Sequence, residues 1–307
     1  MIDPILSAEV QAARRQNRPI VALESTIITH GMPHPQNVEV ACQLEQDIRD
    51  GGATPATIAV IEGRLHVGLE PEQLAHLGQA RGVAKLSRAD LAACLATGGT
   101  GATTVAATMI AARLAGIEVF ATGGIGGVHR GAEASFDISA DLQELAQTPV
   151  TVVAAGAKAI LDISKTLEVL ETLGVPVIAV GQDAFPAFWS ARSPFRAPLR
   201  MDEATPIARA HVMRRALGIP GGQLVANPIP AAAEIPAEEL APIIVSAQAD
   251  AARHRIVGKA VTPYLLQRIY EQTEGRSLAA NIALVRNNAR LAARIAQAMG
   301  AIRNGAG

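Results

Sequence analysis

Short apolar runs alternate with longer helix-like stretches along most of this 307-residue chain. The short runs have the Val and Ile content of buried strands, whereas the longer stretches repeat their apolar residues every three to four positions. Strand-like runs lie at residues 19–25, 117–122, 150–154 and 175–180, and helix-like stretches at residues 71–80, 87–96, 103–116, 139–147, 160–174, 205–218, 237–255 and 278–300. This alternation predicts an α/β fold in which helices sandwich a sheet. No fixed-period repeat, flexible linker or charge block divides the chain, so we expect one domain over residues 1–307.

The composition argues against several kinds of partner. The net charge is −1, so the chain has no excess of positive charge with which to neutralise a nucleic-acid backbone. Aromatic residues make up only 3% of the chain, which leaves few platforms for stacking single-stranded bases. No apolar run approaches the roughly 20 residues needed to cross a bilayer, and the N-terminal residues lack the pattern of a secretory signal. We expect a cytoplasmic protein that binds neither nucleic-acid polymers nor membranes, with Cys42 and Cys94 buried in helices.

A glycine-rich segment, "ATGGIGGVHRGAEASFDISADL", follows the strand-like run at residues 117–122. Ligands of open α/β sheets bind beyond the carboxyl ends of strands, and glycines let backbone N–H groups approach an anion. The segment has neither the spacing of a dinucleotide fingerprint nor that of a P-loop. With His129 and Arg130 as further donors, it predicts an anion site, the alternative being an ordinary tight turn. Asp137 and Asp141 flank Ser139, and they either hold a divalent cation or cap the next helix.

Three further charged residues lie at or near predicted strand ends. Glu24 follows an apolar run, where it is either a general acid or base or a carboxylate that forms a salt bridge or a cap. Lys158, in "VTVVAAGAKAILDI", faces either solvent or a pocket in which its neutral amine would be a nucleophile. Lys85 either binds phosphate or is a solvated surface charge, and the sequence alone favours the surface.

Long ordered segments of the chain resemble the pseudouridine-5′-phosphate glycosidase family, also called the indigoidine synthase A family. The segments that carry the resemblance include "ALESTIITHGMPHPQN", "ATTVAATMIAARLAGIEVFATGGIGGVHRGAEASFDISADLQELA", "VVAAGAKAILDI", "DAFPAFW", "LVANPIP", "GKAVTP" and "GRSLAANIALVRNNARLAA". The resemblance implies an α/β/α fold of three layers with a mixed central sheet. It also implies an enzyme that cleaves the C–C bond of pseudouridine 5′-phosphate to give uracil and ribose 5-phosphate, using Mn²⁺ and assembling as a homotrimer.

The resemblance assigns a role to each matching residue. The Schiff-base lysine falls on Lys158, the proton-transferring glutamate on Glu24 and the metal-binding aspartate on Asp137. The positions implied for substrate binding are Lys85, Val105, Thr122, His129, Ser139, Ala140, Asp141 and Asn281.

Two departures from the family pattern are visible. This chain has "GTGATTVAA" where the family more often has Asn-Gly-Gly before the same helix, which would alter a loop on the substrate side. Ala89 follows Arg88 where we expect another basic residue, which would weaken phosphate binding slightly. Two other readings stay open, namely a Schiff-base phosphosugar lyase or aldolase acting on another substrate, and a non-catalytic nucleotide-binding accessory protein.

Overall fold

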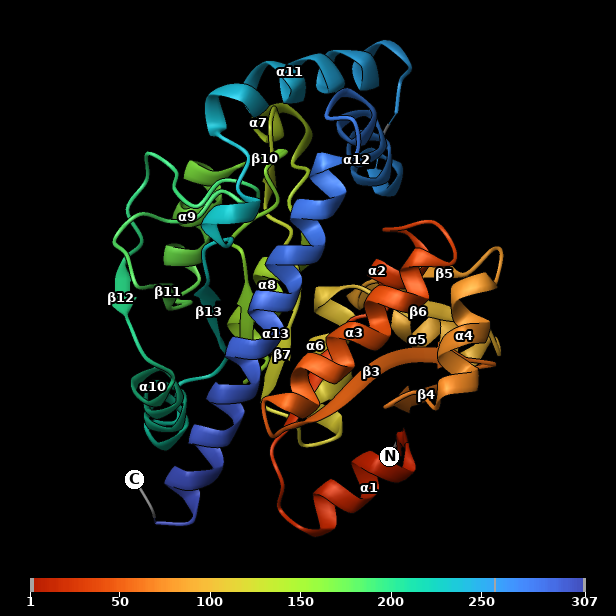
Figure 1. The fold of residues 1–307 in the computed structure, drawn as a ribbon, viewed down its shortest axis with the longest axis vertical. Helices are drawn as coiled ribbons and strands as arrows, with labels where there is room; N and C mark the ends of the chain where they lie inside the picture. The colour runs from red at the N-terminus through yellow and green to blue at the C-terminus, as the bar shows by residue number, and fades with distance from the viewer. Residues whose placement is uncertain (1–2, 257, 306–307) are drawn as a thin grey trace.

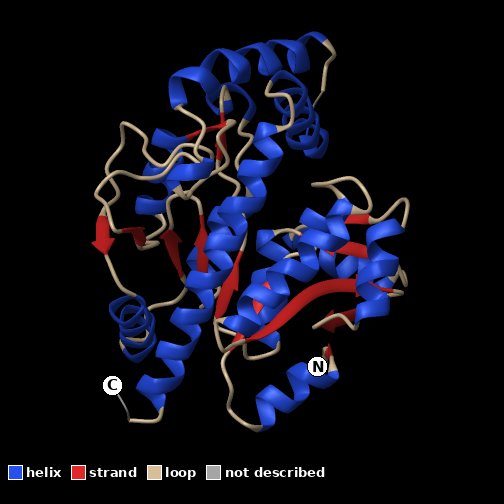
Figure 2. Cartoon of the chain, viewed as in Figure 1, coloured by secondary structure: helices blue, strands red, loops and turns tan. Residues whose placement is uncertain are grey.

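A central, mostly parallel sheet organises the computed structural model, which describes residues 3–256 and 258–305 (Figures 1 and 2). Seven parallel strands form its main part, in the order β3, β2, β7, β9, β13, β11 and β12. Their bounds are β2 (Ile20–Leu23), β3 (Thr54–Ile61), β7 (Val119–Ala121), β9 (Thr151–Ala154), β11 (Val177–Val180), β12 (Leu199–Met201) and β13 (Gln223–Ala226). The central strands are buried on both faces, which explains why they are continuous apolar runs in the sequence.

Antiparallel pairing at the β3 end makes the sheet mixed, as expected. β4 and β6 both run antiparallel to β3, β5 lies parallel to β6, and β1 lies parallel to β4. These strands are β1 (Ile5–Leu6), β4 (Arg64–Val67), β5 (Ala84–Leu86) and β6 (Gly101–Thr103). A separate two-stranded ribbon joins β8 (Val128–His129) to β10 (Leu161–Asp162).

The sheet reverses its winding direction between β2 and β7. From β2 the chain crosses to β3 on one side, and from β7 it crosses to β9 on the other. Because parallel crossovers are right-handed, the connecting helices of these two steps lie on opposite faces of the sheet. The carboxyl ends of β2 and β7 therefore border the crevice in which open α/β sheets bind ligands.

Helices cover both faces, so the three-layer prediction is confirmed. α3 (Gln36–Asp50), α10 (Ala204–Ala216) and α13 (Arg276–Arg303) pack together on one face, and α13 crosses the whole molecule in Figure 1. Asp47 of α3 joins this layer by accepting hydrogen bonds from Arg286 at 2.6 Å and from Arg290 at 2.8 Å. The other face carries α6 (Val105–Leu114), α8 (Ala140–Gln147) and α9 (Ile163–Thr172).

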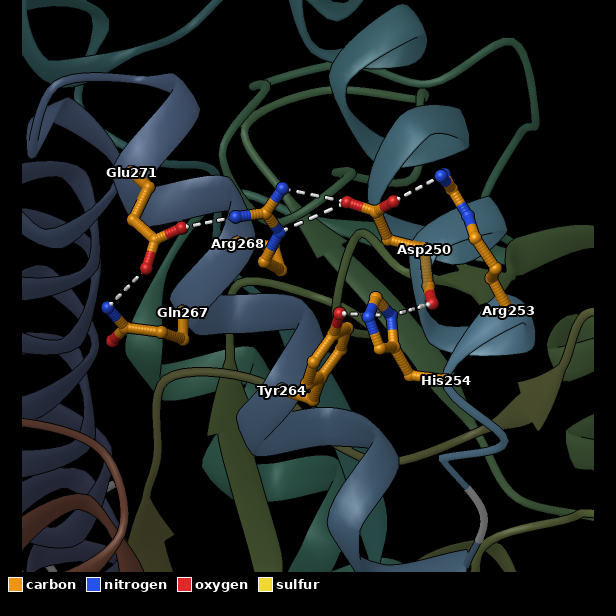
Figure 3. A network of polar contacts seen from close by, with 7 residues as sticks. All are labelled: Asp250, Arg253, His254, Tyr264, Gln267, Arg268 and Glu271. Atoms are coloured by element: carbon orange, nitrogen blue, oxygen red, sulfur yellow. Dashed lines mark hydrogen bonds and ion pairs between the residues drawn. The ribbon is translucent and has the colours of Figure 1, made fainter.

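α11 (Ala237–Arg253) and α12 (Val261–Gln272) form a helical hairpin beside the upper end of α13. Figure 3 shows the polar network that joins them. The Arg268 guanidinium of α12 donates to Asp250 of α11 at 2.7 Å and to Glu271 of its own helix at 2.6 Å. Tyr264 lies 3.3 Å from the His254 ring nitrogen, which adds a second link one turn nearer the connection between the two helices. We call this hairpin the cap.

The remaining elements are short. They are α1 (Ala8–Arg15), α2 (Thr26–Thr29), α4 (Pro71–Gln79), α5 (Arg88–Ala96), α7 (Ala132–Ser135) and the 3-10 turns η1 (Ala231–Ala233) and η2 (Gly258–Ala260). In the described part of the chain, no helix has the length and apolar character that a membrane crossing requires.

Two local predictions are wrong. α9 begins at Ile163, three residues later than expected, because Leu161 and Asp162 pair with β8 and Asp162 caps the helix by accepting from Lys165 N–H at 3.1 Å. Cys94 is buried as expected, but Cys42 is exposed on the outer face of α3.

Candidate active site

Glu24 lies at the winding reversal, directly after β2. One oxygen of its carboxylate accepts a hydrogen bond from Thr26, and the other accepts one from Thr122, which directly follows β7. Thr122 is 1% exposed, so it lies behind the carboxylate. The two hydroxyls fix the orientation of the half-buried Glu24 side chain toward the crevice.

The glycine-rich segment positions Lys158. Ile125 N–H donates to the Gly156 carbonyl, and Lys158 N–H donates to the Ile125 carbonyl, each at 3.1 Å. The ribbon then continues as β8 paired with β10. These backbone bonds hold the Lys158 backbone across the loop from Ile125, and its half-buried side chain opens into the crevice.

Asp141 ties the glycine-rich segment to the start of α6. Its two carboxylate oxygens accept from Gly126 N–H at 2.8 Å and from Ala106 N–H at 3.0 Å, and the side chain is 5% exposed. Ser139 caps α8 by accepting from Asp141 N–H at 3.2 Å. A Cβ at Gly126 would lie 2.2 Å from the Ser139 hydroxyl, so only glycine permits this close approach.

A cavity of about 400 Å³ opens between the sheet, the glycine-rich segment and the cap. All residues predicted for the site line this cavity, with the exception of Thr122. Thr122 lies behind Glu24 and donates a hydrogen bond to its carboxylate. The predicted lining residues are Glu24, Lys85, Val105, His129, Asp137, Ser139, Ala140, Asp141, Lys158 and Asn281. Lys85 is half-buried and lines the cavity, which favours the phosphate-binding alternative for this residue.

Positive charge gathers at one side of the cavity. Burial lowers the pKa of His129, nearby Lys158 and Lys85 lower it further, and Asp137 opposes them from 3.9 Å. Burial and Lys85 likewise lower the pKa of His30, which also lines the cavity. Two lysines beside neutral imidazoles suit an anionic group such as a phosphate.

The glycine-rich segment has a polar and an apolar end. Around Gly126 it meets Ser139 and Asp141, whereas a Cβ at Gly124 would lie 2.7 Å from the Phe188 ring. Further apolar lining comes from Leu284 of α13 and from cap residues Pro263 and Leu266. Along this segment, Gly124 therefore faces the apolar wall, Ile125 bonds to the Lys158 backbone, and Gly126 faces the polar end.

A divalent cation would have one protein carboxylate available at the polar end. Asp137 lines the cavity, but among the described residues no group of three or more His, Cys, Asp or Glu side chains is arranged to hold an ion. A single carboxylate oxygen completed by waters and substrate oxygens suits Mg²⁺ or Mn²⁺, and it does not suit a structural zinc site.

Two sequence expectations about the anion site differ from the geometry. Arg130 is exposed and lines a separate cavity, because His129 and Arg130 are neighbours along an extended segment and point to opposite sides. Arg88 binds the buried Glu144 at 2.5 Å, and Ala89 does not line the cavity. The missing basic residue at position 89 therefore has no evident consequence for an anion bound here.

Sequence reasoning missed the residues that form the walls. The cap contributes Gly258, Thr262, Pro263 and Leu266, while Phe188 comes from the long loop before β12. The "DAFPAFW" segment that carried part of the family resemblance was the available signal for Phe188.

Comparisons with known proteins agree with this architecture. A family model described as "Indigoidine synthase A like protein" matches residues 9–298. A relative from Roseobacter denitrificans, named pseudouridine-5′-phosphate glycosidase, is 76% identical over 293 residues, with 95% of this chain and 94% of the relative covered. A relative of the same name from Jannaschia sp. is 69% identical, with 95% and 97% covered.

Two solved structures are similar over nearly their whole length. The prealnumycin C-glycosynthase AlnA, in complex with ribulose 5-phosphate, has a TM-score of 0.91 and 38% identity, with 99% of both chains covered. An indigoidine synthase A-like protein from Thermotoga maritima has a TM-score of 0.87 and 32% identity, with 96% of both chains covered.

Proposed function

The chain belongs to the indigoidine synthase A-like family, and from this premise we propose that it cleaves the C–C glycosidic bond of pseudouridine 5′-phosphate to give uracil and ribose 5-phosphate. One observation carries the proposal. Glu24 and Lys158 open into the same cavity, which also has apolar walls and a second lysine, Lys85. A proton donor, an amine nucleophile and an anion site are the groups that this reaction requires.

The polarity of the cavity orients the substrate. The uracil ring occupies the apolar end beside Phe188 and Leu284, and the phosphate occupies the polar end beside Lys85 and Ser139. The Lys158 amine attacks the ribose carbon that joins the two parts, and the position of the Lys158 backbone beside Ile125, between Gly124 and Gly126, supports this assignment. Glu24 reaches the ring oxygen from the carboxyl end of β2.

The chemistry begins with opening of the ribose ring, because a carbanion at uracil C5 is a poor leaving group. Glu24 gives a proton to O4′, and the electrons of the uracil ring expel that oxygen from C1′. The neutral amine of Lys158 then adds to C1′ and loses a proton. After C5 is protonated, the C1′–C5 bond breaks as the lysine nitrogen forms an iminium, and water hydrolyses the iminium to release ribose 5-phosphate.

We further propose that Mn²⁺ binds at Asp137, with waters and substrate oxygens as its other ligands. When bound there, the ion supplies positive charge at the polar end of the cavity. The homotrimer and the cytoplasmic location implied by the family resemblance are part of the same proposal. Gel filtration with light scattering measures the assembly, and a monomer would contradict that part.

The test is a product assay with the purified protein. Pseudouridine 5′-phosphate is incubated with and without Mn²⁺, and uracil is followed by chromatography. We expect uracil release that depends on the metal, and borohydride should trap the ribose 5-phosphate adduct on Lys158. Lys158→Ala should bind the substrate without turning it over. Absence of uracil with an intact fold would contradict the proposed function, and full activity of Lys158→Ala would contradict the covalent step.

A second candidate is C–C bond formation between a phosphopentose and another aromatic ring. It is favoured by the likeness to a C-glycosynthase whose structure contains ribulose 5-phosphate. Both reactions use Lys158 and the phosphate end of the cavity. They differ in the aromatic ring that the apolar end accepts, so the identity of that ring distinguishes the two candidates. Release of uracil from pseudouridine 5′-phosphate favours the first candidate, whereas binding of ribose 5-phosphate without uracil turnover favours the second.

A further inference from the structure

We propose that Trp189 is a positioning residue that fixes the amide of Asn281 with its N–H donors toward the substrate. This inference rests on the proposed function for the identity of the group that the amide meets. Trp189 itself does not line the cavity, so it acts only through Asn281.

The contact between the two side chains is direct. The Trp189 indole Nε1–H donates to the Asn281 side-chain oxygen at 2.6 Å. An indole nitrogen can only donate, and Trp189 is 1% exposed, so its partner must be the acceptor atom of the amide. The orientation of the Asn281 amide therefore follows from the chemistry of the pair, and its nitrogen is turned away from the indole.

The rest of Asn281 meets the cavity. The residue is half-buried on α13 and lines the site, and no group within residues 3–256 and 258–305 accepts a hydrogen bond from its amide nitrogen. Asn288, two turns further along α13, is different. Its amide nitrogen donates to the Thr122 carbonyl at 2.8 Å, and its amide oxygen accepts from Asn227 at 3.0 Å. Both polar atoms of the Asn288 amide therefore have partners within the protein. Asn281 is thus built to offer donors to a ligand.

Packing holds the indole in place. The Phe188 ring meets Trp189 edge to face, with 5.1 Å between the ring centroids, and Ile235 N–H donates to the Trp189 carbonyl at 2.9 Å. Phe188 also forms part of the apolar wall. The wall that receives the base and the residue that orients Asn281 are therefore neighbours in one loop.

The consequence is a preference for acceptor atoms. With its oxygen turned toward Trp189, Asn281 presents its NH₂ group to the ligand, so it fits a carbonyl oxygen of uracil and disfavours an exocyclic amino group at the same position. An unanchored asparagine could rotate its amide and satisfy either.

The first test does not depend on turnover. The chain contains one tryptophan, so the indole N–H of protein labelled with ¹⁵N-tryptophan gives a single assignable NMR signal. We expect a hydrogen-bonded signal that exchanges slowly with solvent in the wild type and in Asn281→Asp, because a carboxylate still accepts. Asn281→Ala should shift the signal and speed its exchange. An unchanged signal in Asn281→Ala would overturn the proposed contact.

The second test separates positioning from general support of the fold. Uracil release is measured for Trp189→Phe, Asn281→Ala and the double variant, with thermal melts to confirm folding. We expect Trp189→Phe to lower kcat/KM about tenfold, which corresponds to the free energy of one hydrogen bond. In the Asn281→Ala background, the same substitution should lower kcat/KM almost no further. Independent, additive losses would overturn the inference.

Two more variants complete the design. Gln223→Ala is the matched control, because this 1% exposed residue at the amino end of β13 donates to the Ile207 carbonyl at 2.9 Å and lies at the strand end away from the cavity, so its effect should add to that of Asn281→Ala. Asn281→Asp keeps Trp189 intact and presents only acceptors, so it should raise KM at least tenfold. If wild-type protein releases no uracil, the proposed function fails, and the NMR result still decides whether Trp189 fixes Asn281.

Discussion

Replacing Asp141 with asparagine should destabilise the fold and disable the site together. The Asp141 carboxylate accepts from two backbone N–H groups that belong to different elements, Gly126 in the glycine-rich segment and Ala106 in α6. Asparagine has the same size, but it offers one acceptor oxygen and one NH₂ group. In either amide orientation, one of the two N–H groups would face another donor.

The size of the effect follows from the burial of Asp141, which is 5% exposed. A hydrogen bond to a charged group is worth about 1.5–3 kcal/mol, and an unsatisfied buried N–H costs about 1–3 kcal/mol. Since one neutral hydrogen bond survives in Asp141→Asn, we expect a loss of about 3–5 kcal/mol in the free energy of unfolding. Turnover by the folded protein should fall at least tenfold, because the two walls of the polar end lose their fixed spacing.

Urea unfolding at equal protein concentration measures the loss. Asp162→Asn is the matched control, because asparagine caps helices as well as aspartate does, and the change removes only an exposed ion pair with Lys165 at 3.3 Å while keeping the N–H contact at 3.1 Å. We expect the control to change the free energy of unfolding by less than about 1 kcal/mol. If Asp141→Asn were as stable as the control, the carboxylate would not be what holds the two elements together.

Three further predictions test the acid, the apolar wall and the pH dependence of the fold. Glu24→Gln should lower kcat at least about a hundredfold with little change in KM, and unchanged turnover would contradict its role as proton donor. Gly124→Ala places a Cβ 2.7 Å from the Phe188 ring and should raise KM, whereas Gly300→Ala, which meets open space, should leave kinetics unchanged. Burial, helped by nearby arginines, lowers the pKa of His211 to about 4, so this side chain stays neutral in the folded state while the unfolded chain takes up a proton below its ordinary value of 6.5. The free energy of unfolding should therefore fall by about 3 kcal/mol as the pH drops from 6.5 to 4, and chemical unfolding of His211→Gln across this range should lack that component.

Local sequence predicts that Glu24 and Lys158 lie near strand ends, whereas the roles proposed for them come from the family resemblance. Glu24 and Lys158 each follow a strand that is recognisable as an apolar run, and the carboxyl ends of parallel strands converge. Cys42 could also have been placed correctly. The buried residues of α3 include Val40, Leu44 and Ile48, and a residue two positions after Val40 points away from that face.

Other features depend on contacts that no local pattern contains. The pairing of β8 with β10 decides which of His129 and Arg130 faces the cavity, and it joins segments about thirty residues apart. The Trp189–Asn281 contact spans 92 residues and depends on how the loop before β12 packs against α13. Of the cap, only α11 could be predicted as a helix, and its position over the cavity could not, because that position is set by tertiary packing.

The residues proposed to react and the residues that shape part of the cavity wall belong to different parts of the fold. Glu24 and Lys158 are fixed by the sheet and the glycine-rich segment, whereas Thr262, Pro263 and Leu266 reach the cavity from a hairpin with its own internal polar network. Substitutions on the inner surface of that hairpin can reshape the room for the aglycone without moving the acid or the amine. Variants that accept other bases can therefore be sought by substituting these three residues alone.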